Sequence, residues 1–329
     1  MKYFITGATG FIGGAVARKL RSGGNDVVAI VRNPSKAGDL IAAGVTVVKG
    51  DVTSMESMRS PMTGADGVFH IAGWYKIGVR DRAEAVAINV DGTRNVLRLM
   101  RDLNIPKGVY TSTLAVNSDT HGVEVDESYR FTGRHLSLYD QTKADAHAIA
   151  EDFIAAGLPL VIVQPGLVYG PGDTSAAREA IVQTLSRKLP LVPLKTAYSW
   201  GHIDDIADGH IAAMARGRAG QNYNLCGPSR TLLNGLEIVS RVSGVPLPVM
   251  RPGPGVMRAM AGFMSILEYA APLPPNFSSE FLRVSAGVTY LGANAKARDE
   301  LGFAPRPLET GLADTIAHDR PHPLAEPFA

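Results

Sequence analysis

The sequence predicts an α/β protein with a doubly wound parallel sheet and a smaller C-terminal lobe. Short apolar runs rich in β-branched residues alternate with helical stretches through the first half of the chain, as in parallel βαβ units. These runs are nearly all apolar, which is typical of strands covered by helices on both faces. A chain of 329 residues can bury the core of one large domain or of two joined lobes.

Composition and charge argue against several other classes of protein. Hydrophobic residues make up 45% of the chain, and 33 basic residues against 31 acidic ones leave a balance of +2, which gives little support for nucleic-acid or anionic-membrane partners. The single cysteine, Cys226, excludes an intramolecular disulfide. A strand follows Met1 almost at once, so we expect no signal peptide and a cytoplasmic protein. The late apolar stretch 256–273 contains Arg258 and Glu268, which predicts an amphipathic helix rather than a membrane span.

The expected elements follow in a regular order. Strands are predicted at residues 2–6, 26–31, 45–50, 67–72, 107–113 and 158–165, and helices at residues 11–22, 35–43, 54–60, 83–104 and 139–156. Later the alternation breaks, and Gly and Pro cluster at 165–173 and 246–255. Between these clusters, strands are predicted at 200–203 and 221–227, around a helix over 204–215.

The stretch TGATGFIGG, residues 6–14, lies between the first strand and the first helix. Gly7, Gly10 and Gly13 allow a tight turn and a close approach of the backbone to a phosphate. The helix N-terminus then offers unpaired N–H groups and the positive end of its dipole to a pyrophosphate. The spacing is T-G-x-x-G-x-x-G, and its strand–turn–helix context favours a Rossmann-type dinucleotide site over a glycine-rich turn without a ligand.

This motif suggests how the chain divides by function. We expect residues 1–165 and 200–228 to form the dinucleotide-binding domain. Residues 166–199 and 229–329 are expected to form the smaller substrate-binding lobe, built from segments that cross back and forth.

Further motifs resemble those of the extended short-chain dehydrogenase/reductase family, also described as NAD-dependent epimerases and dehydratases. They are DV at 51–52, HIAG at 70–73, NVDGTRNVL at 89–97, YDQTK at 139–143, QPGLVYGPGD at 164–173 and WGHIDDIADGH at 200–210, and the likeness covers nearly the whole chain. The resemblance implies that Asp51 and Val52 border the adenine and that Asn89 belongs to a supporting helix. It implies further cofactor contacts at Thr9, Phe11, Ile12, Ile71, Ala72, Gly73, Ser112, Tyr139, Lys143, Pro165 and Val168.

Arg32, at the end of the second strand, predicts which cofactor is used. In a dinucleotide fold this strand end lies beside the adenosine ribose, where a carboxylate hydrogen-bonds the 2′-hydroxyl of NAD. An arginine instead accepts the 2′-phosphate of NADP bidentately. Arg32 follows Gly13 at the expected distance, and Lys36 adds a second charge. The sequence therefore predicts a preference for NADP(H), with NAD(H) possible. The alternative is that Arg32 is a solvated surface arginine with no ligand.

YDQTK places Tyr139 and Lys143 four residues apart, on one face of a helix. Free tyrosine has a pKa of about 10, and a neighbouring ammonium is expected to lower it. The pair then predicts a catalytic phenol that exchanges a proton with the substrate oxygen, with the lysine also holding the nicotinamide ribose. The family's pattern places a third catalytic hydroxyl at Thr113, and Ser112 is the alternative because the register could differ by one residue.

The segment HIDDIADGH contains two histidines and several aspartates that superficially resemble a metal site. We expect Asp204 to cap a helix there instead, so the sequence predicts no metal. The chain also contains no G-x-S-x-G, H-E-x-x-H or G-x-x-x-x-G-K-[ST] motif, which argues against elbow-type hydrolases, zincins and P-loop enzymes.

Three departures from relatives bear on the reaction. Leu114 and Ala115 follow Thr113 where 4,6-dehydratases resembling this family carry an Asp-Glu pair. The TAYSWGHIDD segment lacks the arginine with which nucleotide-sugar epimerases commonly hold a diphosphate. Arg32 favours NADP(H) as a dissociating co-substrate, whereas epimerases retain NAD. The likeness is greatest to the dihydroflavonol reductase-like and hydroxysteroid dehydrogenase-like branch.

The sequence therefore predicts NADPH-dependent reduction of a ketone or aldehyde, with Tyr139 as proton donor. Its apolar substrate contacts are expected to be Trp74, Tyr75, Leu114, Tyr169 and Trp200. The Met-rich stretch 257–266 is read as core more readily than as substrate lining. The alternatives are a sugar or nucleotide-sugar epimerase with bound NAD(P), and a non-enzymatic NADP(H)-sensing regulator. The resemblance implies a homodimer through the helices at 83–104 and 139–156.

Overall fold

The computed structural model describes residues 1–78, 82–270 and 278–319. Its main layer is a seven-stranded sheet in the order β3-β2-β1-β4-β5-β6-β9, in which all neighbours are parallel. The strands are β1 (Lys2–Thr6), β2 (Asp26–Val31), β3 (Thr46–Lys49), β4 (Gly67–His70), β5 (Gly108–Thr111), β6 (Leu160–Pro165) and β9 (Asn222–Leu225). The strand order reverses between β1 and β4, so the turn after β1 lies at the switch point where such sheets bind ligands. The predicted doubly wound sheet is confirmed.

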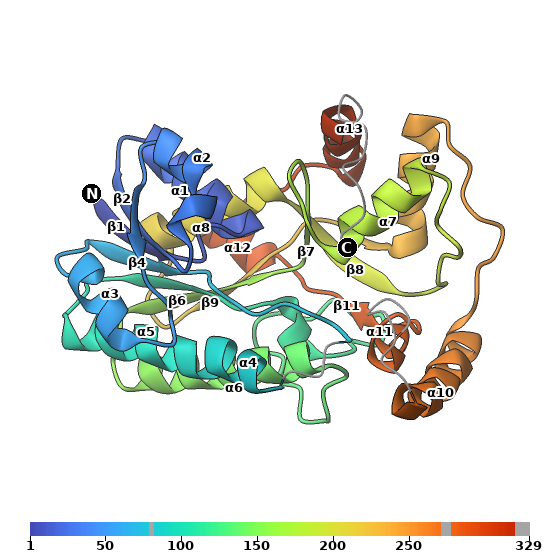
Figure 1. Cartoon of the computed structure of the whole chain (residues 1–329), viewed down its shortest axis with the longest axis horizontal. Helices are drawn as coiled ribbons and strands as arrows, with labels where there is room; N and C mark the ends of the chain where they lie inside the picture. Colours follow the sequence, from blue (N-terminus) through green and yellow to red (C-terminus); the bar gives the residue numbers. More distant parts are fainter. Residues whose placement is uncertain (79–81, 271–277, 320–329) are drawn as a thin grey trace.

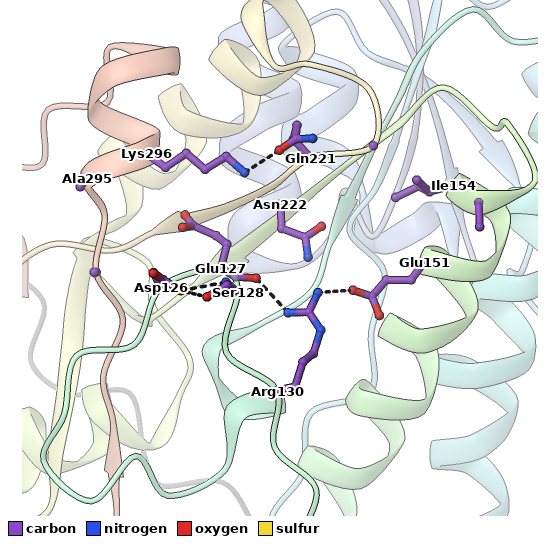
Figure 2. Close-up of a pocket in the computed structure, with 13 residues that line it drawn as sticks. Asp126, Glu127, Ser128, Arg130, Glu151, Ile154, Gln221, Asn222, Ala295 and Lys296 are labelled. Atoms are coloured by element: carbon purple, nitrogen blue, oxygen red, sulfur yellow. Dashed lines mark hydrogen bonds and ion pairs between the residues drawn. The ribbon is translucent and has the colours of Figure 1, made fainter.

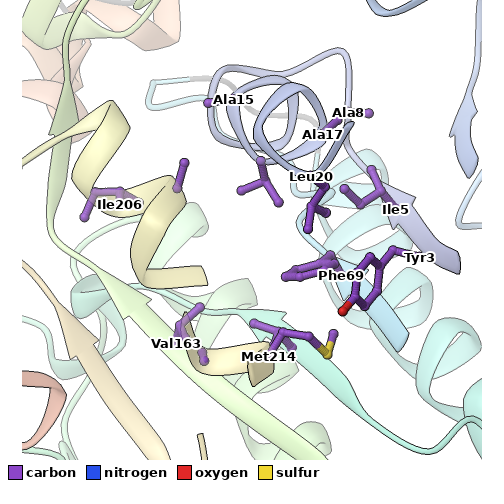
Figure 3. Packing of buried hydrophobic residues seen from close by; sticks show 14 of the residues in the cluster. Tyr3, Ile5, Ala8, Ala15, Ala17, Leu20, Phe69, Val163, Ile206 and Met214 are labelled. Atoms are coloured by element: carbon purple, nitrogen blue, oxygen red, sulfur yellow. The ribbon is translucent and has the colours of Figure 1, made fainter. Parts of the chain in front are cut away.

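Helices cover both faces of this sheet (Figure 1). One face carries α1 (Phe11–Ser22), α2 (Gly38–Ala42), α8 (Ile203–Arg216) and α12 (Ala295–Leu301), and the other carries α3 (Met55–Met62), α5 (Gly92–Asp102) and α6 (Leu138–Ala155). Figure 3 shows the first face, where Leu20 of α1 and Met214 of α8 belong to the same cluster as Phe69 of β4. Burial on both faces explains why these strands are nearly all apolar.

The helix predicted over 83–104 is not uniform. It consists of α4 (Arg82–Ala85), a π-helical segment η2 (Val86–Asp91) and α5, which follow one another without a break. Segments of π-helix are rare and are frequent at functional sites. Here the segment contains Asn89, which is buried.

The C-terminal lobe contains a second, four-stranded sheet, in which β10 (Ser229–Thr231), β11 (Thr289–Tyr290) and β7 (Leu167–Tyr169) all pair with β8 (Ala197–His202). Helices α7 (Ala176–Leu185), α9 (Leu232–Ser243), α10 (Pro254–Ala270), α11 (Ser279–Val284) and α13 (Leu308–Asp319) surround it on the right of Figure 1. The amphipathic helix expected over 256–273 corresponds to α10, and 271–273 lie outside the described residues.

The expected domain boundary at residue 200 falls inside β8, whose neighbouring strands all belong to the small sheet. The chain leaves β8 into α8, which packs against α1 on the main sheet, and then forms the edge strand β9. The chain therefore passes from the lobe to the main sheet directly after His202.

Candidate active site

The turn after β1 is packed so closely that Gly7 and Gly13 have no space for a side chain. Gly7 has a φ of +77°, and a Cβ built there would lie 2.6 Å from the Ala72 nitrogen of the neighbouring loop. A Cβ on Gly13 would lie 2.2 Å from the Gly7 oxygen, which is deep overlap with the turn. The first turn of α1 follows this turn with no acidic side chain and no side-chain cap. Its free N–H groups face the switch point, which suits a phosphate group.

The residues expected beside the adenosine lie at the ends of β2 and β3. Arg32 and Lys36 are exposed, and Arg32 is one of the cations that lower the pKa of Glu84, after the larger effect of the Lys76 hydrogen bond. The Asp51 carboxylate accepts hydrogen bonds from the Thr53 backbone and hydroxyl, both at 2.9 Å.

Val52 is buried beneath α5, where a Cβ on Gly92 would lie 2.8 Å from its side chain. Thr9, Phe11 and Ile12 remain partly or fully exposed around the first turn of α1. The nucleotide end of the predicted site thus keeps an open face.

The loop after β4 is held from two sides. The Thr6 hydroxyl accepts hydrogen bonds from the Ile71 and Ala72 nitrogens, both at 3.2 Å. Asn89 Oδ1 accepts from the Trp74 nitrogen at 2.7 Å, and its Nδ2 donates to Thr142 of α6 at 2.9 Å. The π-helical segment therefore ties the loop after β4 to the helix that carries the predicted catalytic pair.

Tyr139 lies in the first turn of α6, half-buried, with the hydroxyl of Thr113 near its phenol. The ring of Tyr75 meets it edge-on, with 4.8 Å between ring centroids. Burial is the largest effect on Tyr139 and raises the pKa of its phenol, and the nearby Thr113 hydroxyl opposes this rise. The phenol is therefore protonated near neutral pH.

Lys143 is buried one turn further along α6. Its Nζ donates to the Tyr110 hydroxyl at 3.1 Å and to the Thr111 carbonyl at 2.8 Å. Burial lowers the pKa of Lys143 to about 7. The prediction that Lys143 lowers the pKa of Tyr139 is wrong for this arrangement, because the ammonium is directed at β5 and burial dominates at the phenol.

Ser112 and Thr113, the two candidates for the third hydroxyl, face different surroundings. The Ser112 hydroxyl is buried and hydrogen-bonds His147 Nδ1 at 2.8 Å, behind the strand end. Thr113 is half-buried, accepts a hydrogen bond from the Ala115 nitrogen at 3.2 Å and contacts the Tyr139 phenol. The structure thus brings Thr113, and not Ser112, to Tyr139.

Of the predicted substrate contacts, only Tyr75 is exposed, at 48%, and its ring contacts the ring of Tyr139. Trp74 is buried and donates from Nε1 to Glu84 at 2.8 Å. Leu114 is buried against Gly292.

Tyr169 and Trp200 were expected to contact substrate, and the structure contradicts this. Both are at most 2% exposed and belong to the hydrophobic core of the lobe, with Leu236 and Leu312. A Cβ on Gly235 would lie 2.7 Å from the Trp200 ring, so this ring is closely packed. Neither side chain is available to a substrate. Among the expected cofactor contacts from β6 and β7, Pro165 is buried and Val168 is half-buried.

The small sheet contributes groups that sequence reasoning missed. The Tyr290 hydroxyl of β11 donates to Asp140 of α6 at 3.0 Å, and its ring stacks on Tyr198 of β8 with 6.0 Å between centroids. Burial raises the pKa of Asp140 to about 6. Glu280 of α11 accepts from the Leu138 nitrogen at 2.7 Å and from the Gly78 nitrogen at 3.2 Å. No local motif marks these residues, because each acts from a distant segment.

The HIDDIADGH segment holds its own side chains. His202 caps α8 by accepting from the Asp204 nitrogen at 3.3 Å, so the cap expected at Asp204 lies two residues earlier, and Asp204 is in the first turn of the helix. His210 hydrogen-bonds the Thr111 hydroxyl at 3.0 Å and the Ile206 carbonyl at 2.7 Å. Among the described residues no group of three or more potential ligand side chains is placed to hold a metal.

A pocket of about 650 Å³ lies at the outer edge of the main sheet, beside β9 and α6 (Figure 2). Its charged side chains are paired with neighbours, as in the contacts of Arg130 with Glu151 at 3.0 Å and of Lys296 with Gln221 at 2.8 Å. None of the predicted site residues lines it.

Within the described part of the chain, no helix combines the length and apolar character needed to cross a bilayer.

Comparison with known proteins identifies the family of this chain. A family model described as the NAD dependent epimerase/dehydratase family matches residues 3–226. A Synechocystis protein with the provisional name dihydroflavonol 4-reductase is 31% identical over 95% of this chain and 93% of its own length. A Stigmatella aurantiaca ketoreductase that acts on 4-hydroxy-2-methyl-3-oxo-4-farnesyl-3,4-dihydroquinoline-1-oxide is 30% identical over 93% of this chain and 92% of its own. The crystal structure of gox2253 superposes with a TM-score of 0.84 at 29% identity, covering 97% of this chain and 98% of that one.

Proposed function

We propose that this chain, which belongs to the NAD dependent epimerase/dehydratase family, is an NADP(H)-dependent oxidoreductase that reduces a ketone or aldehyde. The observation that carries the proposal is the placement of the Tyr139 phenol beside the Thr113 hydroxyl, at the carboxyl end of β5 near the switch point. It places a protonated phenol and a second hydroxyl together, where a substrate oxygen can accept from both. The names of the two relatives, one a reductase and one a ketoreductase, agree with this reaction.

The backbone cradle fits a dinucleotide. Side chains at Gly7 and Gly13 would overlap the backbone at Ala72 and at Gly7, so glycine is what lets the turn lie this close to the first turn of α1, where a pyrophosphate would bind. Arg32 would hold the 2′-phosphate with its guanidinium, and Lys143 would hold the nicotinamide ribose. The family's description supports a nicotinamide cofactor, and the preference for NADP(H) rests on Arg32.

The reaction needs a hydride, a proton and a hydrogen bond to the oxygen on which charge develops. When bound, the reduced nicotinamide supplies a hydride to the carbonyl carbon. Tyr139 donates its proton to the carbonyl oxygen, and the phenol carries this proton at neutral pH because burial raises its pKa. Thr113 donates a hydrogen bond to the same oxygen as negative charge develops there. The product is an alcohol.

The substrate is proposed to be hydrophobic. Tyr75 presents an exposed ring beside Tyr139, and the rings of Tyr198 and Tyr290 stack close to α6 on the lobe side. An aromatic surface with few charges suits an apolar carbonyl better than a diphosphate. The farnesyl-bearing substrate named for the Stigmatella relative has this character.

The test is NADPH oxidation, followed by absorbance, across aliphatic, aromatic, steroid-like and sugar carbonyls. Tyr139→Phe is expected to lower turnover on the best substrate about a hundredfold or more, because it removes the proton donor. Tyr223→Phe is the matched control, since it also removes the hydroxyl of a buried tyrosine, here one bonded to Glu300 at 2.6 Å. Undiminished turnover in Tyr139→Phe would refute the proposed donor.

The same purified protein separates the two alternatives. Tightly retained oxidised cofactor, seen in the absorption spectrum, would favour an epimerase that recycles bound NAD(P). NADPH binding without turnover on any carbonyl would favour a regulator. A homodimer through α5 and α6, with cytoplasmic location, stays a prediction that sedimentation and cell fractionation would check.

A further inference from the structure

A continuous buried network of side chains lies beneath the proposed active site. Its members are Thr6 of β1, His70 of β4, Thr93 of α5 and Tyr110 of β5, and each is at most 1% exposed. Thr6 Oγ1 lies 2.8 Å from His70 Nδ1, and His70 Nε2 lies 3.0 Å from Thr93 Oγ1. Tyr110 joins them through its ring, which stacks on His70, and its hydroxyl accepts from Lys143 Nζ at 3.1 Å. Polar groups this deeply buried are costly unless all are paired.

The direction of these hydrogen bonds follows from counting donors. The Thr6 hydroxyl accepts two backbone N–H groups, from Ile71 and Ala72, so its own hydrogen is left to donate to His70 Nδ1. His70 is neutral, because burial and then the charge of Lys143 lower its pKa to about 3. Its one ring hydrogen therefore sits on Nε2 and is donated to Thr93.

Tyr110 stands at the other end of this network. The His70 ring stacks on the Tyr110 ring, with 5.4 Å between centroids and 23° between planes. This stacking and the complete burial of the Tyr110 side chain hold its hydroxyl in place. Lys143 donates to this hydroxyl and to the Thr111 carbonyl, which uses two of the three ammonium hydrogens. The third is left for a group in the cofactor cleft.

We propose that Tyr110 is a positioning residue for Lys143, held in register with the cofactor loop at Ile71 and Ala72 by His70 and Thr93. A lysine has a long flexible stem, and without a fixed acceptor its ammonium would sample many positions. The network gives that charge one location. It also joins the location to the loop on which the cofactor would rest. This inference rests on the proposed role of Lys143 in the reaction.

The first test is kinetic. Tyr110→Phe keeps the ring and its stacking on His70 but removes the acceptor, so kcat is expected to fall about tenfold or more, while KM for the carbonyl stays within about twofold. Thr93→Val is expected to lower kcat in the same way, and Thr93→Ser, which restores a hydroxyl, is expected to recover most of it. Tyr223→Phe is again the matched control, because it removes a buried phenol hydroxyl on the edge strand of the same sheet.

The second test needs neither cofactor nor turnover. The Tyr110 hydroxyl stabilises the charged form of Lys143, so its loss leaves more neutral amine. Modification of Lys143 by a small amine-reactive reagent near pH 5, well below its pKa of about 7, read by mass spectrometry on the cofactor-free protein, is expected to be about tenfold faster in Tyr110→Phe. It is expected to be unchanged in Tyr223→Phe.

The outcomes separate this inference from the proposed function. If Tyr139→Phe is inactive but Tyr110→Phe matches wild type in kcat and in Lys143 reactivity, the positioning role is refuted and the reductase stands. If Tyr139→Phe retains full activity, the proposed function fails, and faster modification of Lys143 in Tyr110→Phe still supports the hydrogen-bonded placement of the ammonium.

Discussion

Two sides of the proposed site are built differently. The nucleotide side comprises the Gly7–Gly13 turn, Arg32 and the buried network from Thr6 to Lys143. Arg32 is exposed, whereas the polar side chains of the network are buried and hydrogen-bonded to one another. The substrate side comprises Asp140, Tyr198, Tyr290 and Glu280. There burial raises the pKa of Asp140, and Glu280 connects the start of α6 at Leu138 with the segment at Gly78.

This difference indicates which measured properties depend on each side: cofactor binding, kcat and the pH dependence of stability. Paired neutral groups with no room to move set the position of backbone and ammonium, so changes there act on cofactor binding and on kcat. Asp140 has a pKa raised to about 6 and Lys143 a pKa lowered to about 7, so pH enters stability from both sides; on the substrate side it does so through Asp140, between about pH 4 and pH 6. Four predictions test this contrast, from the largest expected effect to the smallest.

Gly13→Ala would break the nucleotide side. The new Cβ would lie 2.2 Å from the Gly7 oxygen, a backbone atom that cannot rotate away. We expect loss of NADPH binding by about a hundredfold or more in a fluorescence titration, with destabilisation of about 1–3 kcal/mol from overpacking. Gly38→Ala is the control, because a Cβ there meets nothing within 4 Å. Equal NADPH affinity in both variants would contradict the cradle.

Asp140→Asn would remove the pH dependence assigned to the substrate side. Burial raises the carboxyl pKa to about 6 from 3.8, so between these values the folded state binds more protons and stability falls as pH rises. The asparagine variant is expected to lack this fall, worth up to about 3 kcal/mol. Urea unfolding from pH 4 to pH 7 measures it. Asp39→Asn, an exposed carboxylate in α2, controls for general charge effects, and identical pH profiles for wild type and Asp140→Asn would contradict the assignment.

Arg32→Asp would sharpen the contrast at the nucleotide side. Loss of the guanidinium removes a bidentate partner for the 2′-phosphate and adds a repelling carboxylate. We expect NADPH affinity to fall about tenfold or more, with NADH affinity little changed or improved. Isothermal titration with both cofactors measures the ratio. An equal loss for the two would show that Arg32 does not read the phosphate.

Tyr290→Phe gives the smallest expected effect. It removes the donor to Asp140, at 3.0 Å, while keeping the ring stacked on Tyr198. The expected loss of stability at pH 7 is about 1 kcal/mol. In a double-mutant cycle with Asp140→Asn, the two changes are expected to be non-additive by a similar amount. Strict additivity would show that the hydrogen bond carries no energy.

Much of the main sheet could be predicted from local sequence. Each strand is a short apolar run, and each helix has its own period, so residues near in sequence specify the elements. The glycine spacing predicts the turn because only glycine fits the φ of +77° and the close approach at Gly13. The four-residue spacing of Tyr139 and Lys143 likewise predicts one helix face.

Other features depended on contacts between distant segments. Ser112 and Thr113 are neighbours on one strand end, and their side chains point to opposite sides, so only the packing of α6 decides which one meets Tyr139. Lys143 was expected at the phenol, and the buried hydroxyl of Tyr110 holds it elsewhere. Tyr169 and Trp200 have the composition of a substrate lining, yet they are covered by helices from later in the chain.

What the sequence determined by itself is the α/β alternation, the phosphate turn and the helix that carries the phenol, because each follows from spacing within a few residues. What only the tertiary structure decided is which partner each polar group meets. The network from Thr6 to Lys143 joins β1, β4, α5, β5 and α6, and the acids of the substrate side meet residues more than a hundred positions away. Such contacts depend on how whole layers pack, which no local pattern specifies.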